Sequence, residues 1–328
     1  MIQTFSRFFV VTSAAALVSC GSPNGAAKES KDGGRKYFVA FSQCNNAEPY
    51  RAAQNQLLTR IAAQSPDIHL SITDGQQDTS KQIAQIETLI LQKPDLLIVA
   101  PNERAPLTAV MGKAMAAGIK TICLERDIVE PNYTTYIACD NLAIGRQAGQ
   151  FIVEHLQKKY GKPRGKIVEL KGLLGVEGQI NRHGGAHEVF AKYPDVRVIH
   201  EAVADWLQSK ARERMIEILR AQPEIDVVYA HNDPMAVGAY LAAQELGRDK
   251  KMIFVGVDGL GGPAGGIKKV MDGVLAVSFY YPLAVDKAME IGNRMLREPA
   301  FTPEKKYMLS TEIITPENAA RLYQKLTF

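Results

Sequence analysis

Short apolar runs alternate with longer amphipathic segments through most of the chain. Runs such as YFVAFSQ (37–43), DLLIVAP (95–101) and KIVELKG (166–172) have the length of buried strands, and the segment 52–64 repeats apolar residues at helical spacing. Strands that are largely apolar and separated by helices are typical of parallel sheets with both faces covered. The alternation runs to residue 140 and then restarts, which predicts an α/β protein with two doubly wound halves.

The first residues do not fit this alternation. Arg7 precedes an apolar run, residues 8–18, that is too short to span a membrane and is typical of a secretory signal over residues 1–19. The stretch LVSC, ending at Cys20, resembles a bacterial lipobox, so we expect cleavage before Cys20 and lipid attachment to it. An ordinary signal peptide with a chance cysteine is the alternative. Residues 20–36 otherwise hold only small, polar and charged side chains, which predicts a flexible tether after the lipidated Cys20.

Length, charge and cysteine content narrow the choice of function. Residues 37–328 exceed what one hydrophobic core usually supports, so we expect two domains. The chain has 39 basic and 35 acidic residues and a formal charge of +4, without a basic run, so nucleic acid is not implied. Cys44, Cys123 and Cys139 have no C-x-x-C spacing and are odd in number, which argues against a disulfide framework; Cys123 and Cys139 lie in apolar runs typical of buried thiols.

Two local patterns superficially suggest a metal or a nucleotide. His183 and His187 are spaced i, i+4 on an expected helix, but no third ligand is near in sequence, so we expect a solvated or packed pair and no metal site. Gly172, Gly175 and Gly178 suggest a phosphate loop, but no Lys-Ser/Thr pair follows them. The sequence therefore predicts no cofactor.

Polar side chains follow most of the expected strands. In open α/β sheets, ligands bind at the carboxyl ends of the strands. The groups at those ends are mainly amides, carboxylates and guanidinium forks, which make the two-pronged hydrogen bonds that vicinal sugar hydroxyls accept and donate. Aromatic rings suited to the C–H face of a sugar lie near these ends. The candidates are Tyr50, Trp206, Phe279 and Tyr280.

A series of short motifs runs along residues 37–328. The motifs are FSQ followed by YRAA (50–53), DGQQ (74–77), LERD (124–127), a loop at Arg182, AHND (230–233) and VDG (257–259). Their order resembles the periplasmic sugar-binding proteins of the ribose/galactose type and is most similar to their galactofuranose-binding branch. The resemblance implies a type I periplasmic binding protein fold, in which two doubly wound parallel-sheet domains are joined by a three-segment hinge. It also implies that the protein delivers a monosaccharide to an ABC importer.

The resemblance also assigns roles to individual residues. Tyr50 and Arg51 would lie in the first ligand loop, and Arg182 would hold ring or anomeric oxygens of the sugar. Asn232 and Asp258 would bond sugar hydroxyls. The remaining expected ligand residues are Glu48, Glu125, Arg126 and Tyr280. Beside Asn232, we expect Asp233 to be the N-cap of the next helix, with Pro234 at its first position.

Three departures from the family pattern leave the sugar undefined. Glu125 stands where relatives have Asp, and Glu48 adds a negative charge to a loop that is usually small and polar. The run Phe279-Tyr280-Tyr281 stands where relatives have Gln or Glu, which suggests another sugar or a ligand with an apolar edge.

By the same analogy, the first lobe is residues 37–140 plus 281–307, and the second is residues 141–280 plus 308–328. The expected partners are a monosaccharide, the membrane subunits of an ABC importer, and a membrane through the lipid anchor, with no nucleic acid. We expect a monomer in the periplasm or at the surface of the cell envelope.

Other classes of function remain open. A membrane-tethered sensor would use the same cleft but pass its closure to a receptor or kinase. A glycosidase would need two carboxylates, with Glu125 and Asp258 as the only candidates in the cleft, and we do not expect an enzyme. A DNA-binding repressor is disfavoured because the signal peptide and tether occupy the place of a helix-turn-helix.

Overall fold

The computed structural model describes residues 36–326 of the 328-residue chain. From Lys36 onward the chain forms one compact unit. The expected signal peptide, Cys20 and all but the last residue of the tether lie outside the described residues and stay predictions. In the described part, no helix combines the length and apolar character needed to cross a membrane.

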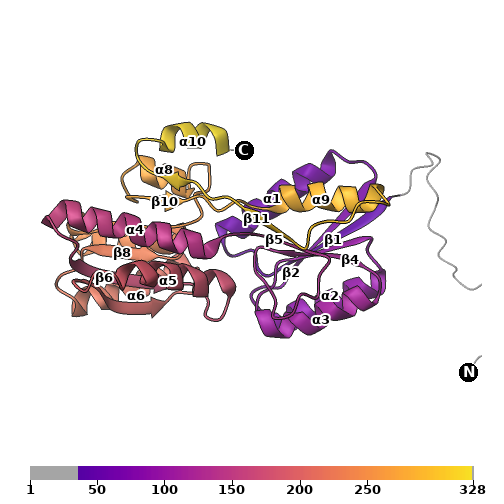
Figure 1. Ribbon diagram of the computed structural model, residues 1–328, viewed down its shortest axis with the longest axis horizontal. Coiled ribbons are helices and arrows are strands. Elements are labelled where there is room, and N and C mark those ends of the chain that lie inside the picture. The colour runs from indigo at the N-terminus through magenta and orange to yellow at the C-terminus, as the bar shows by residue number, and fades with distance from the viewer. Residues whose placement is uncertain (1–35, 327–328) are drawn as a thin grey trace, which may run out of the picture. The chain divides into compact units, whose positions relative to one another are not determined.

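Residues 37–139, together with residues 306–309 from near the end of the chain, build a six-stranded parallel sheet in the order β11-β5-β4-β3-β1-β2. Helices α1 and α9 pack together on one face, and α2 and α3 pack together on the other (Figure 1). The strands are β1 (Tyr37–Gln43), β2 (Ile68–Asp74), β3 (Leu96–Val99), β4 (Lys120–Leu124), β5 (Thr135–Cys139) and β11 (Lys306–Leu309). The helices are α1 (Pro49–Ala63), α2 (Thr79–Gln92), α3 (Arg104–Ala116) and α9 (Val285–Arg297).

The apolar strands of this sheet are buried on both faces, as their pattern predicts. Along β1, Val39 and Phe41 join the core on the α1 and α9 side, whereas Ala40 joins the core beneath α2 and α3. Leu96 and Leu97 of β3 divide in the same way. Successive side chains of a strand point to opposite faces, so an unbroken apolar run requires cover on both sides.

The second half repeats the architecture around a four-stranded parallel sheet in the order β7-β6-β8-β9. Helix α4 packs on α5, and α6 packs on α7. The strands are β6 (Gly165–Lys171), β7 (Val196–Val203), β8 (Val227–Ala230) and β9 (Ile253–Val255). The helical segments are α4 (Asn141–Tyr160), α5 (Glu177–Phe190), α6 (Gln208–Ala221), α7 (Asp233–Glu245), the 3₁₀ turn η1 (Asp249–Lys251), α8 (Gly266–Met271) and α10 (Ala319–Leu326).

Small residues set the close approach of α4 and α5. A Cβ on Gly145 of α4 would lie 2.5 Å from the carbonyl oxygen of Arg182, and a Cβ on Gly185 of α5 would lie 2.3 Å from the carbonyl oxygen of Leu142. Neither helix can therefore carry a larger residue at these points without moving its neighbour. The contact fixes the position of Arg182, which matters for the site described below.

The chain passes between the two sheets at three places, as the resemblance implies. The passages follow β5, the short strand β10 (Ser278–Phe279) and β11, and β10 pairs antiparallel with β12 (Ile313–Ile314). We call residues 36–140 and 281–309 the first lobe, and residues 141–280 and 310–326 the second lobe. Strand β11 ends at Leu309, two residues beyond the boundary expected at 307.

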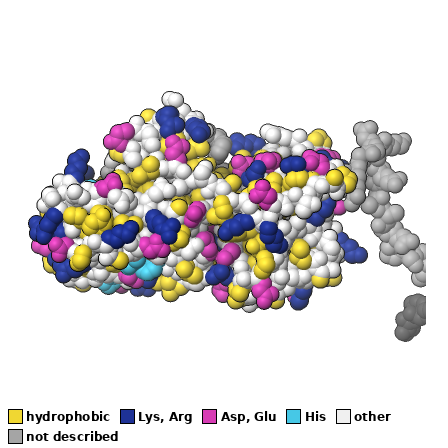
Figure 2. Space-filling model, in the orientation of Figure 1, with side chains coloured by type: hydrophobic (Ala, Val, Ile, Leu, Met, Phe, Trp, Pro, Cys, Tyr) yellow, Lys and Arg dark blue, Asp and Glu magenta, His cyan; other side chains and the backbone are white. Residues whose placement is uncertain are grey.

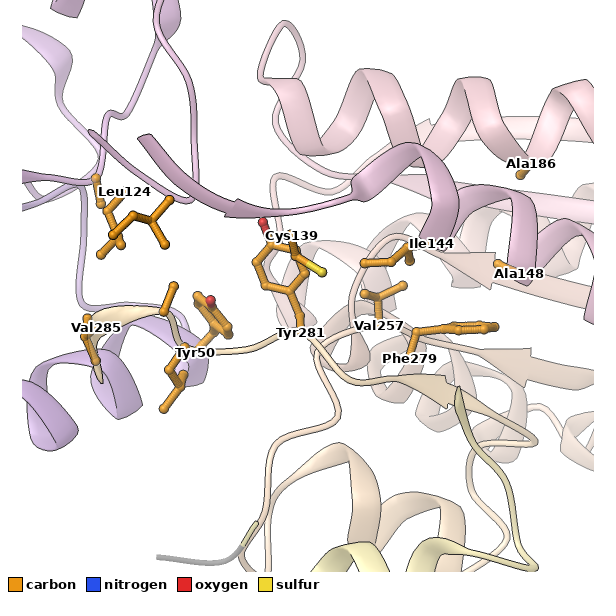
Figure 3. Close-up of a cluster of buried hydrophobic side chains, with 14 of the residues drawn as sticks. Tyr50, Leu124, Cys139, Ile144, Ala148, Ala186, Val257, Phe279, Tyr281 and Val285 are labelled. Atoms are coloured by element: carbon orange, nitrogen blue, oxygen red, sulfur yellow. The ribbon is translucent and has the colours of Figure 1, made fainter. Parts of the chain in front are cut away.

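Buried apolar side chains are continuous along the passages between the sheets. Figure 3 shows Tyr50 and Val285 in the first lobe, Tyr281 and Cys139 on the passages, and Ile144 in the second lobe, and all five belong to one core cluster. The thiols of Cys44, Cys123 and Cys139 are buried and form no disulfide in the described part of the chain, which confirms the expectation of buried thiols for Cys123 and Cys139.

Candidate functional site

A small cavity lies where the carboxyl ends of strands from both lobes converge. Its volume is ≈ 20 Å³, about the space of one water molecule. Eight of the nine ligand residues expected from the sequence line it. The lining residues are Glu48, Tyr50, Arg51, Glu125, Arg126, Val176, Gly178, Arg182, Trp206, Asn232, Asp258 and Tyr281.

On the first-lobe side of the cavity, two arginines and two glutamates form a cluster of opposite charges. Arg51 Nη1 lies 2.6 Å from Glu125 Oε2, and Arg126 lies 3.7 Å from Glu48 and 3.8 Å from Glu125. All four residues are buried. Burial raises the pKa of Glu125, but the charges of Arg51 and Arg126 outweigh it and lower that pKa below its ordinary value. Glu125 is therefore a carboxylate, able to accept hydrogen bonds.

Helix α1 and the end of β4 position these groups. Glu48 is the residue before Pro49, the first residue of α1, so Tyr50 and Arg51 stand in the first helical turn. Glu125 follows β4 directly and has φ 65°, a left-handed conformation that is costly for a residue with a Cβ. A hydrogen bond of 2.7 Å from its amide to the Ile137 carbonyl holds it there.

Two hydrogen-bonding groups on the first-lobe side of this cavity are incompletely paired. Arg51 Nε is buried and has no hydrogen-bond partner in residues 36–326; a carboxylate oxygen of Glu48 lies 3.9 Å from it. Oε2 of Glu125 also lacks an aligned hydrogen bond, although it contacts Arg51. Buried polar atoms are usually hydrogen-bonded, so these two are placed for an added partner.

On the second-lobe side, Arg182 lies between two aromatic rings. Its guanidinium carbon is 4.7 Å from the ring centroid of Tyr281 and 5.6 Å from that of Trp206. Its Nε donates to Asn141 Oδ1 at 2.8 Å, and its Nη1 donates to the carbonyl of His231. The flat guanidinium is thus fixed by stacking and by hydrogen bonds before any ligand arrives.

The prediction that Asp233 caps α7 is wrong. Asn232 is the N-cap: its Oδ1 accepts from the amide of Met235 at 3.0 Å, and its Nδ2 donates to the Trp206 carbonyl at 3.1 Å. Asp233 is the first residue of the helix, and its carboxylate accepts from the Gly259 amide and from the Ser278 hydroxyl, each at 2.7 Å. Pro234 is therefore the second helical residue. Asn232 still lines the cavity.

Asp258 completes the ring of polar groups. It is buried, with φ 127°, and its backbone bridges to Tyr280 of the passage between the lobes. Burial raises the pKa of Asp258, and so does the neighbouring charge of Asp233. Burial also raises the pKa of Asp233, to about 7. A carboxyl group that takes up a proton readily can donate as well as accept a hydrogen bond.

Tyr280 was expected in the site, but Tyr281 lines the cavity instead. Tyr280 packs against the core of the second lobe, and its amide donates to the Glu312 carbonyl at 2.8 Å. Adjacent side chains of an extended segment point to opposite sides, so Tyr281 can face the cavity only if Tyr280 faces away from it. The ring of Tyr281 lies 5.5 Å from that of Tyr50, whose hydroxyl donates to the Pro282 carbonyl at 2.6 Å.

Trp206, whose role the sequence left open, also faces the cavity. It has φ 70°, and its ring packs so closely on Gly172 that a Cβ there would lie 2.2 Å from a ring carbon. Its Nε1 is buried and unpaired in the described part of the chain. Val176 and Gly178 also line the cavity, and no sequence signal marked them as ligand residues.

Wider hollows also occur in the described part of the chain, and one of them shares Asp258 with the small cavity. One, of ≈ 560 Å³, is at the amino ends of the second-lobe strands, and several of its charges are paired with one another, as in Lys159–Asp226 and Lys162–Asp195. Another, of ≈ 670 Å³, lies between the lobes beside Asp258 and is lined mostly by small and apolar residues such as Pro49 and Leu260. Neither gathers planar hydrogen-bonding groups at strand ends as the small cavity does.

Comparisons with known proteins agree with this geometry. The periplasmic binding protein domain family matches residues 38–296. The chain is 30% identical over 247 residues to the ribose import binding protein of Bacillus subtilis (strain 168), covering 74% of this chain and 77% of that protein. It is 29% identical over 298 residues to the galactofuranose-binding protein of Escherichia coli (strain K12), covering 88% and 90%.

Solved structures give the same result. The fructose-binding periplasmic domain of a hybrid two-component system superposes with a TM-score of 0.82 at 35% identity, covering 88% of this chain and 94% of that one. A galactofuranose-binding protein superposes with a TM-score of 0.81 at 28% identity, covering 88% and 98%. The expected fold of two parallel-sheet lobes is confirmed.

Proposed function

Because the chain belongs to the periplasmic binding protein domain family, we propose that it captures a monosaccharide between its lobes and delivers it to an ABC importer of the cell envelope. The observation that carries this proposal is the convergence of planar groups from both lobes on one cavity. Arg51 and Arg126 come from the first lobe and Arg182 from the second, and all three are buried.

The chemistry of these groups suits a polyol. Guanidinium groups donate to sugar oxygens in two directions, and the carboxylates of Glu125 and Asp258 accept from hydroxyls. Arg51 Nε and Trp206 Nε1 lack partners in the described residues and supply two further donors, and Glu125 Oε2, which contacts Arg51, supplies an acceptor. Hydrogen bonds to charged groups are each worth about 1.5–3 kcal/mol. Several of them would reach the roughly −8 kcal/mol of micromolar binding.

Capture requires movement of the lobes. Ligand pockets usually enclose about 300–1,000 Å³, whereas the cavity measures ≈ 20 Å³. The three passages between the sheets allow a hinge motion that admits the sugar, after which closure brings both lobes onto it. A ligand that touches both lobes binds the closed form more tightly and shifts the equilibrium toward it. The closed form is the shape that importer subunits would recognise.

The proposal includes the cellular location. Cleavage before Cys20 and lipid attachment would tether the protein to a membrane, with residues 21–36 as the spacer. A sensor that passes closure to a signalling partner is the second candidate, supported by the structural likeness to a periplasmic domain of a hybrid two-component system. Both candidates use the same sugar site, and affinity capture of importer subunits rather than a kinase would favour the importer. We propose no catalytic step at this site.

A thermal-shift screen tests the binding function. We expect one pentose, hexose or furanose to raise the melting temperature by mass action, and nuclear magnetic resonance to find that sugar chemically unchanged after incubation. The matched variants are Arg126→Lys, which replaces a planar guanidinium in the cavity by a single ammonium group, and Arg146→Lys at an exposed position. Sugar binding should weaken only in the first. Hydrolysis of the sugar, or equal affinity of both variants, would contradict the proposal.

A further inference from the structure

A fully buried carboxylate in the second lobe is surrounded by three histidines. Glu169 of β6 has its Oε1 at 3.0 Å from His183 Nδ1, its Oε2 at 2.8 Å from His187 Nε2, and its Oε1 also at 2.8 Å from His231 Nε2. His183 and His187 stand one turn apart on α5, so both rings face the strand below. Their ring centroids are 4.0 Å apart.

A second carboxylate lies on the neighbouring strand. Glu201 of β7 is the register partner of Glu169 in the parallel β6–β7 pair, so both side chains leave the same face of the sheet. Its Oε1 lies 3.9 Å from His187 Nε2, and its Oε2 binds Lys171 at 2.6 Å. Ligand atoms of Glu169, His183, His187 and Glu201 all lie within 4.8 Å of one another.

We propose that Glu169, His183, His187 and Glu201 form a binding site for a divalent transition-metal ion of the zinc type. Two imidazole nitrogens and two carboxylate oxygens are a donor set that zinc accepts in tetrahedral geometry. Bonds of about 2.0–2.2 Å place tetrahedral ligand atoms roughly 3.3 Å apart. The nitrogen–oxygen separations at Glu169 need to widen by a few tenths of an ångström, and the separation at Glu201 needs to shrink by about 0.6 Å.

The ligands are free to make these adjustments. The side chains of His183, His187 and Glu201 are 32%, 33% and 37% exposed, so they can rotate and an ion can enter from solvent (histidine side chains reach the surface in Figure 2). Each imidazole can carry its proton on the other ring nitrogen, which leaves the inward nitrogen free for the ion. The two carboxylates offset the charge of a divalent ion.

Outer contacts would hold the ligands in place. His231 donates to Glu169 Oε1 and leaves Oε2 for the ion, and Lys171 occupies only Oε2 of Glu201 and leaves Oε1. Such hydrogen bonds orient metal ligands in proteins. The site is separate from the sugar cavity, and the inference does not depend on the proposed function.

The test is calorimetric titration of Zn²⁺ into the full chain, purified without a polyhistidine tag and stripped with a chelator. We expect one equivalent to bind and to raise the melting temperature. His187→Gln and Glu201→Gln should each weaken binding by about tenfold or more, since a ligand matters at least as much as an outer-shell partner. The matched control is His200→Gln, because His200 is adjacent to Glu201 on β7 and points to the other face of the sheet.

Cobalt(II) gives a second readout that needs no variant. A four-coordinate site of nitrogen and oxygen ligands gives Co²⁺ an intense visible absorption that zinc should displace. Circular dichroism melts without metal check that each variant folds. If His187→Gln on α5 fails to fold, Glu201→Gln still tests the site, because it changes a partly exposed side chain on β7. Absence of Zn²⁺ binding by the unsubstituted chain, or equal binding by His187→Gln, Glu201→Gln and His200→Gln, would overturn the assignment.

Discussion

Replacing Arg51 by lysine removes one donor that the structure leaves without a partner. Lysine keeps the positive charge near Glu125 but lacks Nε, which is buried and unpaired in the described residues. If Arg51 Nε donates to the sugar, Arg51→Lys loses one charge-assisted hydrogen bond, worth about 1.5–3 kcal/mol. At about 1.4 kcal/mol per factor of ten, the dissociation constant of the sugar rises by roughly 10- to 150-fold.

The free energy of unfolding of the unliganded protein should change by less than the free energy of sugar binding, because two effects of the substitution partly cancel. Arg51→Lys also loses the 3.2 Å hydrogen bond from Nη1 to Gln54 Oε1, a cost of about 1.5–3 kcal/mol at most, and it removes a buried unpaired donor, which offsets part of that cost. Urea melts of Arg51→Lys and of the unsubstituted protein, both without sugar, measure this change in the free energy of unfolding separately from the affinity.

The assay is isothermal titration calorimetry with the sugar that the thermal-shift screen selects. Arg146→Lys, at a side chain that is half exposed and paired with Glu188, is the control for the same substitution outside the cavity. An Arg51→Lys dissociation constant within twofold of the unsubstituted value would refute a hydrogen bond from Nε to the ligand.

Three further predictions follow from single contacts. Tyr281→Ala should abolish sugar binding, whereas Tyr280→Ala should retain it, because only Tyr281 lines the cavity; equal loss in calorimetry would place both rings at the ligand. Gly145→Ala should destabilise the second lobe by about 1–3 kcal/mol in urea melts, because its Cβ would lie 2.5 Å from the Arg182 carbonyl; an unchanged midpoint would show that α4 and α5 can separate. Burial raises the pKa of Asp226, but hydrogen bonds from Lys159, Tyr160 and the Lys166 amide outweigh it and lower that pKa. A carboxyl group with a depressed pKa stabilises the fold above its ordinary value of about 3.9, and loses that contribution as pH falls through the folded value. The stability gap between the unsubstituted chain and Asp226→Asn should therefore narrow in acid, and a gap independent of pH would contradict this.

The fold was predictable because burial on both faces leaves an unbroken apolar strand pattern. Val39, Ala40 and Phe41 alternate between two cores, and that alternation is visible in the sequence as a continuous run. Part of the cavity was predictable for a related reason: Glu125, Asn232 and Asp258 stand at strand ends, which parallel sheets bring to one edge. Tyr50, Arg51 and Arg182 lie on helices, and their place at the cavity was expected from the family resemblance.

The two wrong predictions each missed the correct residue by one position along the backbone. Asn232 and Asp233 can each cap a helix, and the sequence does not show which side chain accepts from Met235 and which reaches Gly259. The choice between Tyr280 and Tyr281 depends in the same way on which side of the passage each one faces.

Contacts between elements that are far apart in the sequence could not be predicted from local spacing. We expected no metal site at His183 and His187 because no third ligand is near them in the sequence. The fold brings Glu169 and Glu201 to those rings through strand register, which local spacing does not show. Trp206 likewise reaches the cavity through a left-handed turn at φ 70°.

A crystal structure with the sugar selected by the screen would show directly which side chains hold the ligand. We expect the sugar between the lobes, within hydrogen-bonding distance of Arg51 Nε and of the carboxyl groups of Glu125 and Asp258, with an aromatic ring against one face. A sugar bound in either wider hollow, or held by one lobe alone with these three side chains untouched, would contradict it.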